Sequence, residues 1–61
     1  MKPKVQLSGN DGNVFLLIGL CQKAARSAGW SVQQIEEFMA EAESDDYDHF
    51  LATAQRYFNV Q

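Results

Sequence analysis

Residues 13–28 decide the fold of this chain and read NVFLLIGLCQKAARSA. Their apolar members recur at the three- and four-residue spacing that lines up one face of an α-helix. This stripe consists of Val14, Leu17, Ile18, Cys21, Ala25 and Ala28. Gln22, Lys23 and Arg26 fall outside it. We therefore predict a central helix from Asn13 to Ala28 whose one buried face is covered by the rest of the chain.

Turn-forming and capping residues predict two further helices. The first helix is expected to begin at a cap among Asp11, Gly12 and Asn13 and to end at Gly29, in the left-handed position that favours glycine. Ser31 followed three residues later by Gln34 is typical of a capping box. The second helix would bury Val32, Ile35, Phe38, Met39 and Ala42. The third, after the break at residues 44–46, would bury Tyr47, Phe50, Leu51, Ala54 and Tyr57 or Phe58.

The two ends of the chain have the alternation of short β-strands. Polar and apolar residues alternate over 4–7, so Val5 and Leu7 can face the core. They alternate again over 58–60, and we expect the two segments to pair. The sequence therefore predicts one α+β domain over residues 1–61, in the order β-α-α-α-β.

Composition limits the classes of protein to which this chain can belong. Its 61 residues carry a net charge of −3, with a pI near 4.7 and 46% apolar residues. Clustered lysine and arginine, which a nucleic-acid binder needs, are lacking, so nucleic acid is an unlikely partner. No apolar run reaches the roughly 18 residues of a membrane span, and we expect a cytoplasmic protein without a membrane partner. A single cysteine cannot form an internal disulfide. Because a domain this small has little core to stabilise it, we expect its helices to pack very well or the chain to form a homodimer.

Four blocks of sequence carry a resemblance. They are Val5-Gln6-Leu7, Asp11-Gly12-Asn13-Val14-Phe15, Asp46-Tyr47-Asp48-His49 and Arg56-Tyr57-Phe58-Asn59-Val60. In this order, over nearly the whole chain, they resemble a group of small uncharacterised bacterial proteins of unknown function. Asp45 stands where that pattern leads us to expect a glycine. The resemblance implies a small bacterial domain and implies no catalytic residues.

The densest polar cluster contains Asp46, Asp48 and His49, preceded by Asp45. Asp45 and His49 are four residues apart and would share a helix face. Such a cluster could hold a divalent ion or orient the imidazole for acid–base chemistry. A metal would need further ligands from elsewhere in the chain, for which Glu41 and Asp11 are candidates. The simpler interpretation, which we favour, is a solvated helix start with no metal, cofactor or catalytic residue.

Two other segments resemble functional sites only superficially. The loop Gly9-Asn10-Asp11-Gly12-Asn13 could expose helix N–H groups to a phosphate, but it matches no nucleotide-binding motif. We favour a capped connection there. Cys21 lies within the apolar stripe and is expected to be a buried hydrophobic residue rather than a nucleophile.

The chain has many large apolar residues for its size. Some are expected to stay outside the core and form an interface. The candidates are Phe15, Leu16, Trp30, Tyr57 and Phe58. A fully internal core is the alternative. Phe15 and Leu16 are the strongest candidates, because they lie beside the stripe of the first helix.

These observations lead to three hypotheses of function. The first is a small acidic protein–protein interaction module that associates with itself, and not an enzyme. The second is a ligand- or divalent-metal-binding protein that uses Asp46, Asp48 and His49. The third is an acidic inhibitor of a nucleic-acid-binding protein, which the modest charge of −3 makes weaker.

Overall fold

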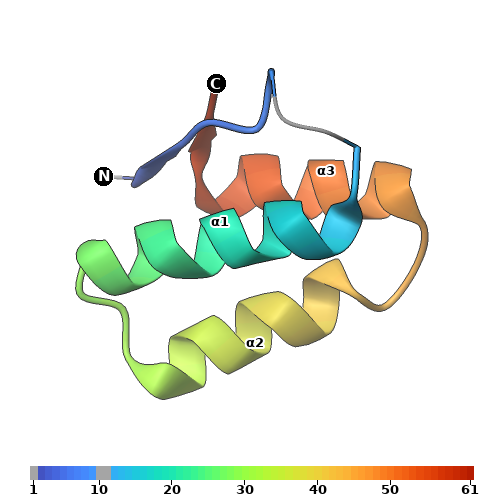
Figure 1. The fold of residues 1–61 in the computed structure, drawn as a ribbon. Coiled ribbons are helices and arrows are strands. Elements are labelled where there is room, and N and C mark those ends of the chain that lie inside the picture. The colour runs from blue at the N-terminus through green and yellow to red at the C-terminus, as the bar shows by residue number, and fades with distance from the viewer. Residues whose placement is uncertain (1, 10–11) are drawn as a thin grey trace.

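A computed structural model describes residues 2–9 and 12–61 and has the predicted β-α-α-α-β order. Strand β1 comprises Lys4–Val5, and helix α1 comprises Val14–Ser27. Helices α2 and α3 span Val32–Ala42 and Tyr47–Tyr57. Strand β2 comprises Asn59–Val60. The three helices pack together, and the two strands lie side by side over one side of them (Figure 1). The α+β prediction is confirmed.

The two strands form a parallel pair that joins the two ends of the chain. Lys4 lies opposite Asn59, and Val5 lies opposite Val60. β1 is shorter than the predicted strand over 4–7. The pairing nevertheless continues past it, because the backbone N–H groups of Leu7 and Ser8 both donate to the carbonyl of Gln61, at 2.8 and 3.0 Å. Val5 and Leu7 are buried as the alternation predicted.

A side-chain cap marks the start of each helix. The amide oxygen of Asn13 accepts from the backbone N–H of Phe15, which places the first cap at the last of the three candidate residues. Ser31 and Gln34 exchange both hydrogen bonds of the predicted capping box, at 3.1 and 2.8 Å. Asp46 caps α3 by accepting from the backbone N–H of His49. Gly29 follows α1 at φ 86°, as predicted.

The core lies where the three helices and β1 meet. Its buried apolar residues are Val5, Leu7, Leu17, Ile18, Cys21, Ala25, Ile35, Phe38, Ala42, Phe50, Ala54 and Phe58. Three residues that the helical stripes placed in the core are on the surface: Ala28 lies just after α1, Val32 is 73% exposed and Tyr47 is 44% exposed. Each lies at a helix end, where the spacing continues but the neighbouring element no longer covers the side chain.

An aromatic cluster holds the end of α3 against the connection between α1 and α2. The indole ring of Trp30 stacks on Phe58, with ring centres 5.1 Å apart. Phe38 meets Phe58 edge to face, also at 5.1 Å, and Tyr57 packs against both Trp30 and Phe38. Edge-to-face and offset contacts of this kind stabilise beyond the area they bury. The cluster therefore joins the end of α3 to α2 and to the connection before it, which are distant from the end of α3 in sequence.

Candidate functional site

The imidazole of His49 lies at the centre of a polar cluster. The partners of the ring are not the neighbouring residues at the start of α3 but Glu41, Ser44 and Thr53. Its Nε2 lies 2.8 Å from Oε2 of Glu41, in the last turn of α2, and 3.0 Å from the carbonyl of Glu41. The hydroxyl groups of Ser44 and Thr53 lie 3.2 and 3.4 Å from the same nitrogen. Glu41, which the sequence suggested only as a possible further ligand, is thus the main partner.

This arrangement shifts the acid–base behaviour of His49. The hydrogen bond from the ring to the Glu41 carboxylate raises the pKa of His49 above its ordinary value of 6.5. Partial burial of the ring acts in the opposite direction, and the Glu41 carbonyl and the charges of Glu41 and Asp45 raise the pKa further. The protonated form therefore joins the end of α2 to the first turns of α3.

Asp46, Asp48 and His49, which the sequence suggested as a site, have different surroundings in the structure. The Asp46 carboxylate is engaged in capping α3. Asp48 is exposed in the first turn, and His49 faces Glu41. Among residues 2–9 and 12–61, no group of three or more His, Cys, Asp or Glu side chains is close enough to hold a metal ion. Asp11, the other suggested ligand, lies outside the described residues.

The remaining polar candidates have structural roles wherever the structure describes them. Cys21 is completely buried in the core, and burial raises the pKa of its thiol to about 11. A thiol with so high a pKa is a poor nucleophile near neutral pH. In the loop before α1, Asn13 caps the helix, whereas Asn10 and Asp11 lie outside the described residues.

The five interface candidates divide into two groups. Phe15 is 76% exposed and Leu16 45% exposed, so both are available to a partner. Phe58 is only 1% exposed, and its ring lies inside the aromatic cluster, which removes it from any interface. Trp30 and Tyr57 are half-buried in the same cluster. The chain therefore packs most of its aromatic residues internally and leaves Phe15 outside.

Phe15 borders an apolar cleft where three helix ends meet. The cleft has a volume of about 200 Å³. Its lining includes the buried side chains of Ile18, Ala42 and Phe50, one from each helix. Phe15, which is largely exposed, and Tyr47, which is partly exposed, also line it. The sequence does not predict this cleft, because its lining residues come from three helices and no spacing along the chain connects them.

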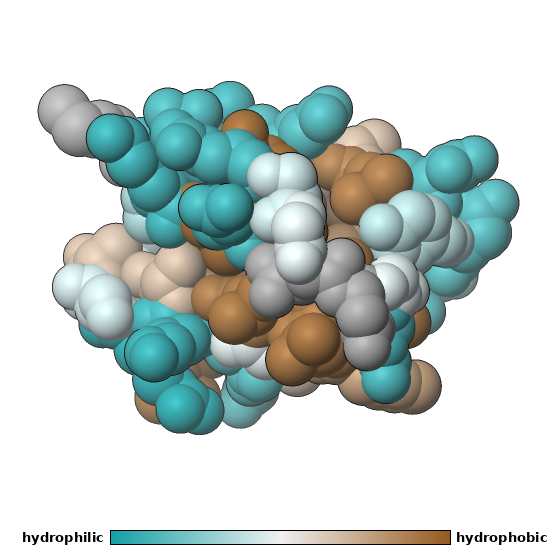
Figure 2. Space-filling view, turned by 45° about the horizontal axis from the view of Figure 1, so that its top comes forward, coloured by the Kyte–Doolittle hydropathy of each residue, from teal (hydrophilic) through white to brown (hydrophobic). Residues whose placement is uncertain are grey.

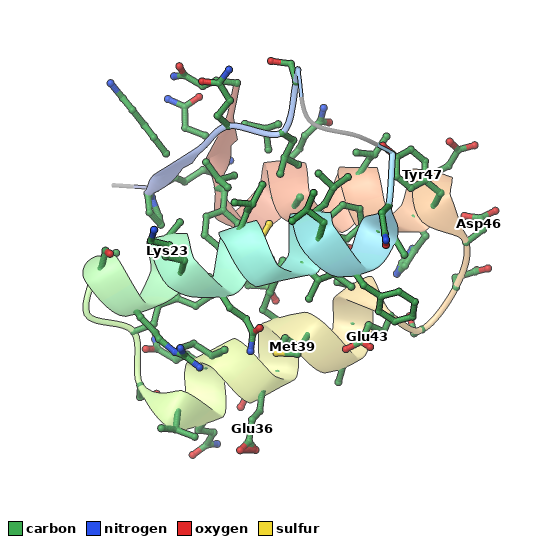
Figure 3. All side chains as sticks on the ribbon, in the orientation of Figure 1. Lys23, Glu36, Met39, Glu43, Asp46 and Tyr47 are labelled. Atoms are coloured by element: carbon green, nitrogen blue, oxygen red, sulfur yellow. The ribbon has the colours of Figure 1, made fainter. Side chains whose placement is uncertain are left out.

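Three carboxylates also line the cleft. Glu43 follows α2, Asp45 lies in the connection, and Asp46 caps α3. Glu43, Asp46 and Tyr47 lie at the same end of the molecule in Figure 3, whereas Glu36 projects from α2 away from that end and Lys23 lies toward the other end of α1. The cleft is therefore apolar within and negatively charged around it.

A second hollow, of about 510 Å³ and wide open to solvent, lies between β1 and the second half of α1. Lys4 and Lys23 line it together with Leu20 and Ala24. In the space-filling view, apolar atoms reach the surface across the middle of the face that carries β1 and α1, between hydrophilic areas (Figure 2). Both charged and apolar surfaces are thus unevenly distributed over the molecule.

Comparisons of the chain with protein-family models, with curated proteins and with solved structures find no match. The resemblance suggested by the sequence blocks therefore stays an expectation. No helix in the described part of the chain is long and apolar enough to cross a membrane.

Proposed function

We propose that this chain is a small acidic protein–protein interaction module whose contact surface surrounds Phe15. The observation that carries the proposal is the 76% exposure of this phenylalanine beside an apolar cleft, in a chain that buries or half-buries its other phenylalanine and tryptophan rings. Exposed aromatic residues next to an apolar recess are typical of interface centres. The proposal includes a cytoplasmic location, where the single cysteine, Cys21, stays reduced.

The size of the cleft supports binding of a side chain rather than of a cofactor. Small-molecule sites usually have volumes of about 300–1,000 Å³. The cleft beside Phe15 has about 200 Å³. His49, the one residue suited to acid–base chemistry near neutral pH, is not among its lining residues. These features favour an interaction module over an enzyme.

Self-association, expected from the small size of the chain, does not fit this surface well. In a two-fold dimer centred on Phe15, the same surface of both copies would meet. Glu43, Asp45 and Asp46 would then face their own counterparts, and like charges oppose such a contact. A self-associated form would therefore join this surface to a different surface of the second copy.

Site-specific crosslinking in cells tests the proposal. A photoreactive phenylalanine analogue replaces Phe15 in one variant and Val32 in the other, since both residues are strongly exposed but Val32 lies at the start of α2. We expect a discrete crosslinked product from position 15 alone, and its mass distinguishes a second copy from another protein. Equal crosslinking at both positions, or none at position 15, would contradict the proposal.

A further inference from the structure

We propose that the partner of the Phe15 surface is a basic segment of another protein, which places an apolar side chain in the cleft and lysine or arginine side chains on the surrounding carboxylates. This inference rests on the proposed function and specifies the chemistry of the partner. The cleft surface is defined by its lining residues, namely Val14, Phe15, Ile18, Ala42, Glu43, Asp45, Asp46, Tyr47 and Phe50.

Charge is the first argument. The cleft surface contains three carboxylates and none of the five lysine and arginine residues of the chain. The hydrogen bonds described for Asp45 and Asp46 are to backbone N–H groups, which leave the negative charge in place. A basic partner would neutralise this charge, whereas an acidic one would be repelled.

The aromatic residues supply the second argument. Phe15 is 76% exposed and Tyr47 is 44% exposed, and both rings line the cleft. The faces of aromatic rings attract ammonium and guanidinium groups, and the stems of lysine and arginine cover apolar surface. A basic side chain can therefore use both the rings and the carboxylates, while a neighbouring apolar side chain fills the recess.

A second copy of the chain is the other possible occupant. Lys4 and Lys23 line the open hollow between β1 and α1, which shares no lining residue with the cleft surface. In a head-to-tail dimer, one copy would keep a free cleft surface and the other a free hollow. Further copies could add to both, which would produce rings or open filaments. The two lysines of that hollow are fewer than the three carboxylates of the cleft surface. A separate basic segment therefore matches the cleft better.

The test uses two synthetic peptides of about 15 residues that form amphipathic helices with the same leucines. One carries lysine and the other glutamate on its polar face. Amide NMR signals of the isotope-labelled protein report where each peptide binds. We expect saturable binding of the lysine peptide, signal shifts centred on Phe15, Ala42 and Tyr47, and weakening of binding at higher salt.

Matched variants separate the contributions of charge and apolar contact. Glu43→Lys and Glu36→Lys make the same charge change, but only Glu43 lines the cleft. We expect Glu43→Lys to weaken binding of the lysine peptide at least about fivefold and Glu36→Lys to have a much smaller effect. Phe15→Ser should weaken it about tenfold, and Val32→Ser should not, because Val32 is equally exposed but distant. Glu43 follows α2, where a lysine suits the helix dipole, so this variant is expected to fold.

The possible results fall into separate groups. Equal binding of both peptides, or equal effects of Glu43→Lys and Glu36→Lys, would overturn the basic partner while leaving the interaction surface intact. If the protein forms concentration-dependent oligomers and Glu43→Lys abolishes them, the occupant of the cleft is a second copy of the chain and the basic partner is overturned. If Phe15→Ser does not weaken binding of the lysine peptide and crosslinking from position 15 also fails, the proposed function itself is overturned.

Discussion

At the scale of single residues, His49 shows how one side chain can connect two helices. Its ring lies on α3 and its carboxylate partner, Glu41, lies on α2, with a contact of 2.8 Å. Ser44, in the connection, donates to the Glu41 carbonyl at 2.8 Å and lies 3.2 Å from the ring. The contact is half exposed, so salt and water weaken it. Its effect is expected to depend on pH.

The first prediction concerns this pH dependence. Because the pKa of His49 is raised in the folded chain, the folded state binds the proton more tightly than the unfolded state. The stabilisation is therefore complete below the unfolded pKa of about 6.5 and is lost as the pH rises through the folded pKa. Glu41→Gln should lower the His49 pKa, measured by NMR titration of the single histidine. The melting temperature of the Glu41→Gln variant should be lower than that of the native chain, and this difference should be larger at about pH 5.5 than at about pH 8.

Glu36→Gln is the control for this prediction. Glu36 is exposed on the same helix, but the charges that shift the His49 pKa come from Glu41 and Asp45. We expect it to leave the His49 pKa close to that of the native chain. If neither Glu41→Gln nor Glu36→Gln changes the His49 pKa, the contact with Glu41 does not hold in solution.

At the scale of elements, the helix starts are the best specified parts of the chain. The second prediction uses the capping box of α2, in which Ser31 accepts from the backbone N–H of Gln34. Ser31→Ala should lower the free energy of unfolding by about 1 kcal/mol, because a backbone N–H loses its partner. Ser27→Ala, at an exposed position in the last turn of α1, should change it by less than about 0.5 kcal/mol. Urea denaturation measures both, and equal effects would contradict the role of the cap.

The elements also show which features could be predicted from sequence. The cap formed by Ser31 acts over three residues, so local sequence was sufficient to find it. The break at residues 44–46 was found in the same way, although Asp46 was not singled out there as the cap of α3. Burial at helix ends was not predictable, because the exposure of Val32 depends on how far its neighbours extend. The same limit applies to the site. The contact between Glu41 and His49 depends on how separate helices pack, which periodicity does not encode. The same holds for the cleft that Phe15 and Tyr47 both line.

At the scale of the whole molecule, the described structure begins and ends at the same small sheet. The backbone N–H of Gln61 donates to the carbonyl of Val5 at 2.9 Å, and the N–H of Asn59 donates to the carbonyl of Pro3 at 2.8 Å. An isolated two-stranded sheet is barely stable in water. Here Val5 belongs to the core, and Phe58, the residue directly before β2, is buried in the same core. The helices therefore hold the two strands in register.

The third prediction tests this pairing. Gln61→Pro removes the N–H that donates to Val5 and should lower the free energy of unfolding by about 1 kcal/mol. Gln61→Ala keeps the backbone N–H and changes only an exposed side chain, so it should have little effect. Thermal unfolding followed by circular dichroism measures both variants. Equal stability of the two would mean that the hydrogen bond does not contribute.

The parallel strand pair also has a consequence for synthesis on the ribosome. β1 is made early, but β2, its partner, is separated from it by all three helices. Val5 therefore emerges long before Val60 exists and has no strand with which to pair. Chains are synthesised at about 5–20 residues per second, far more slowly than helices form. We expect α1 to be able to form before β2 has been made, whereas the sheet can close only after Gln61 has left the exit tunnel.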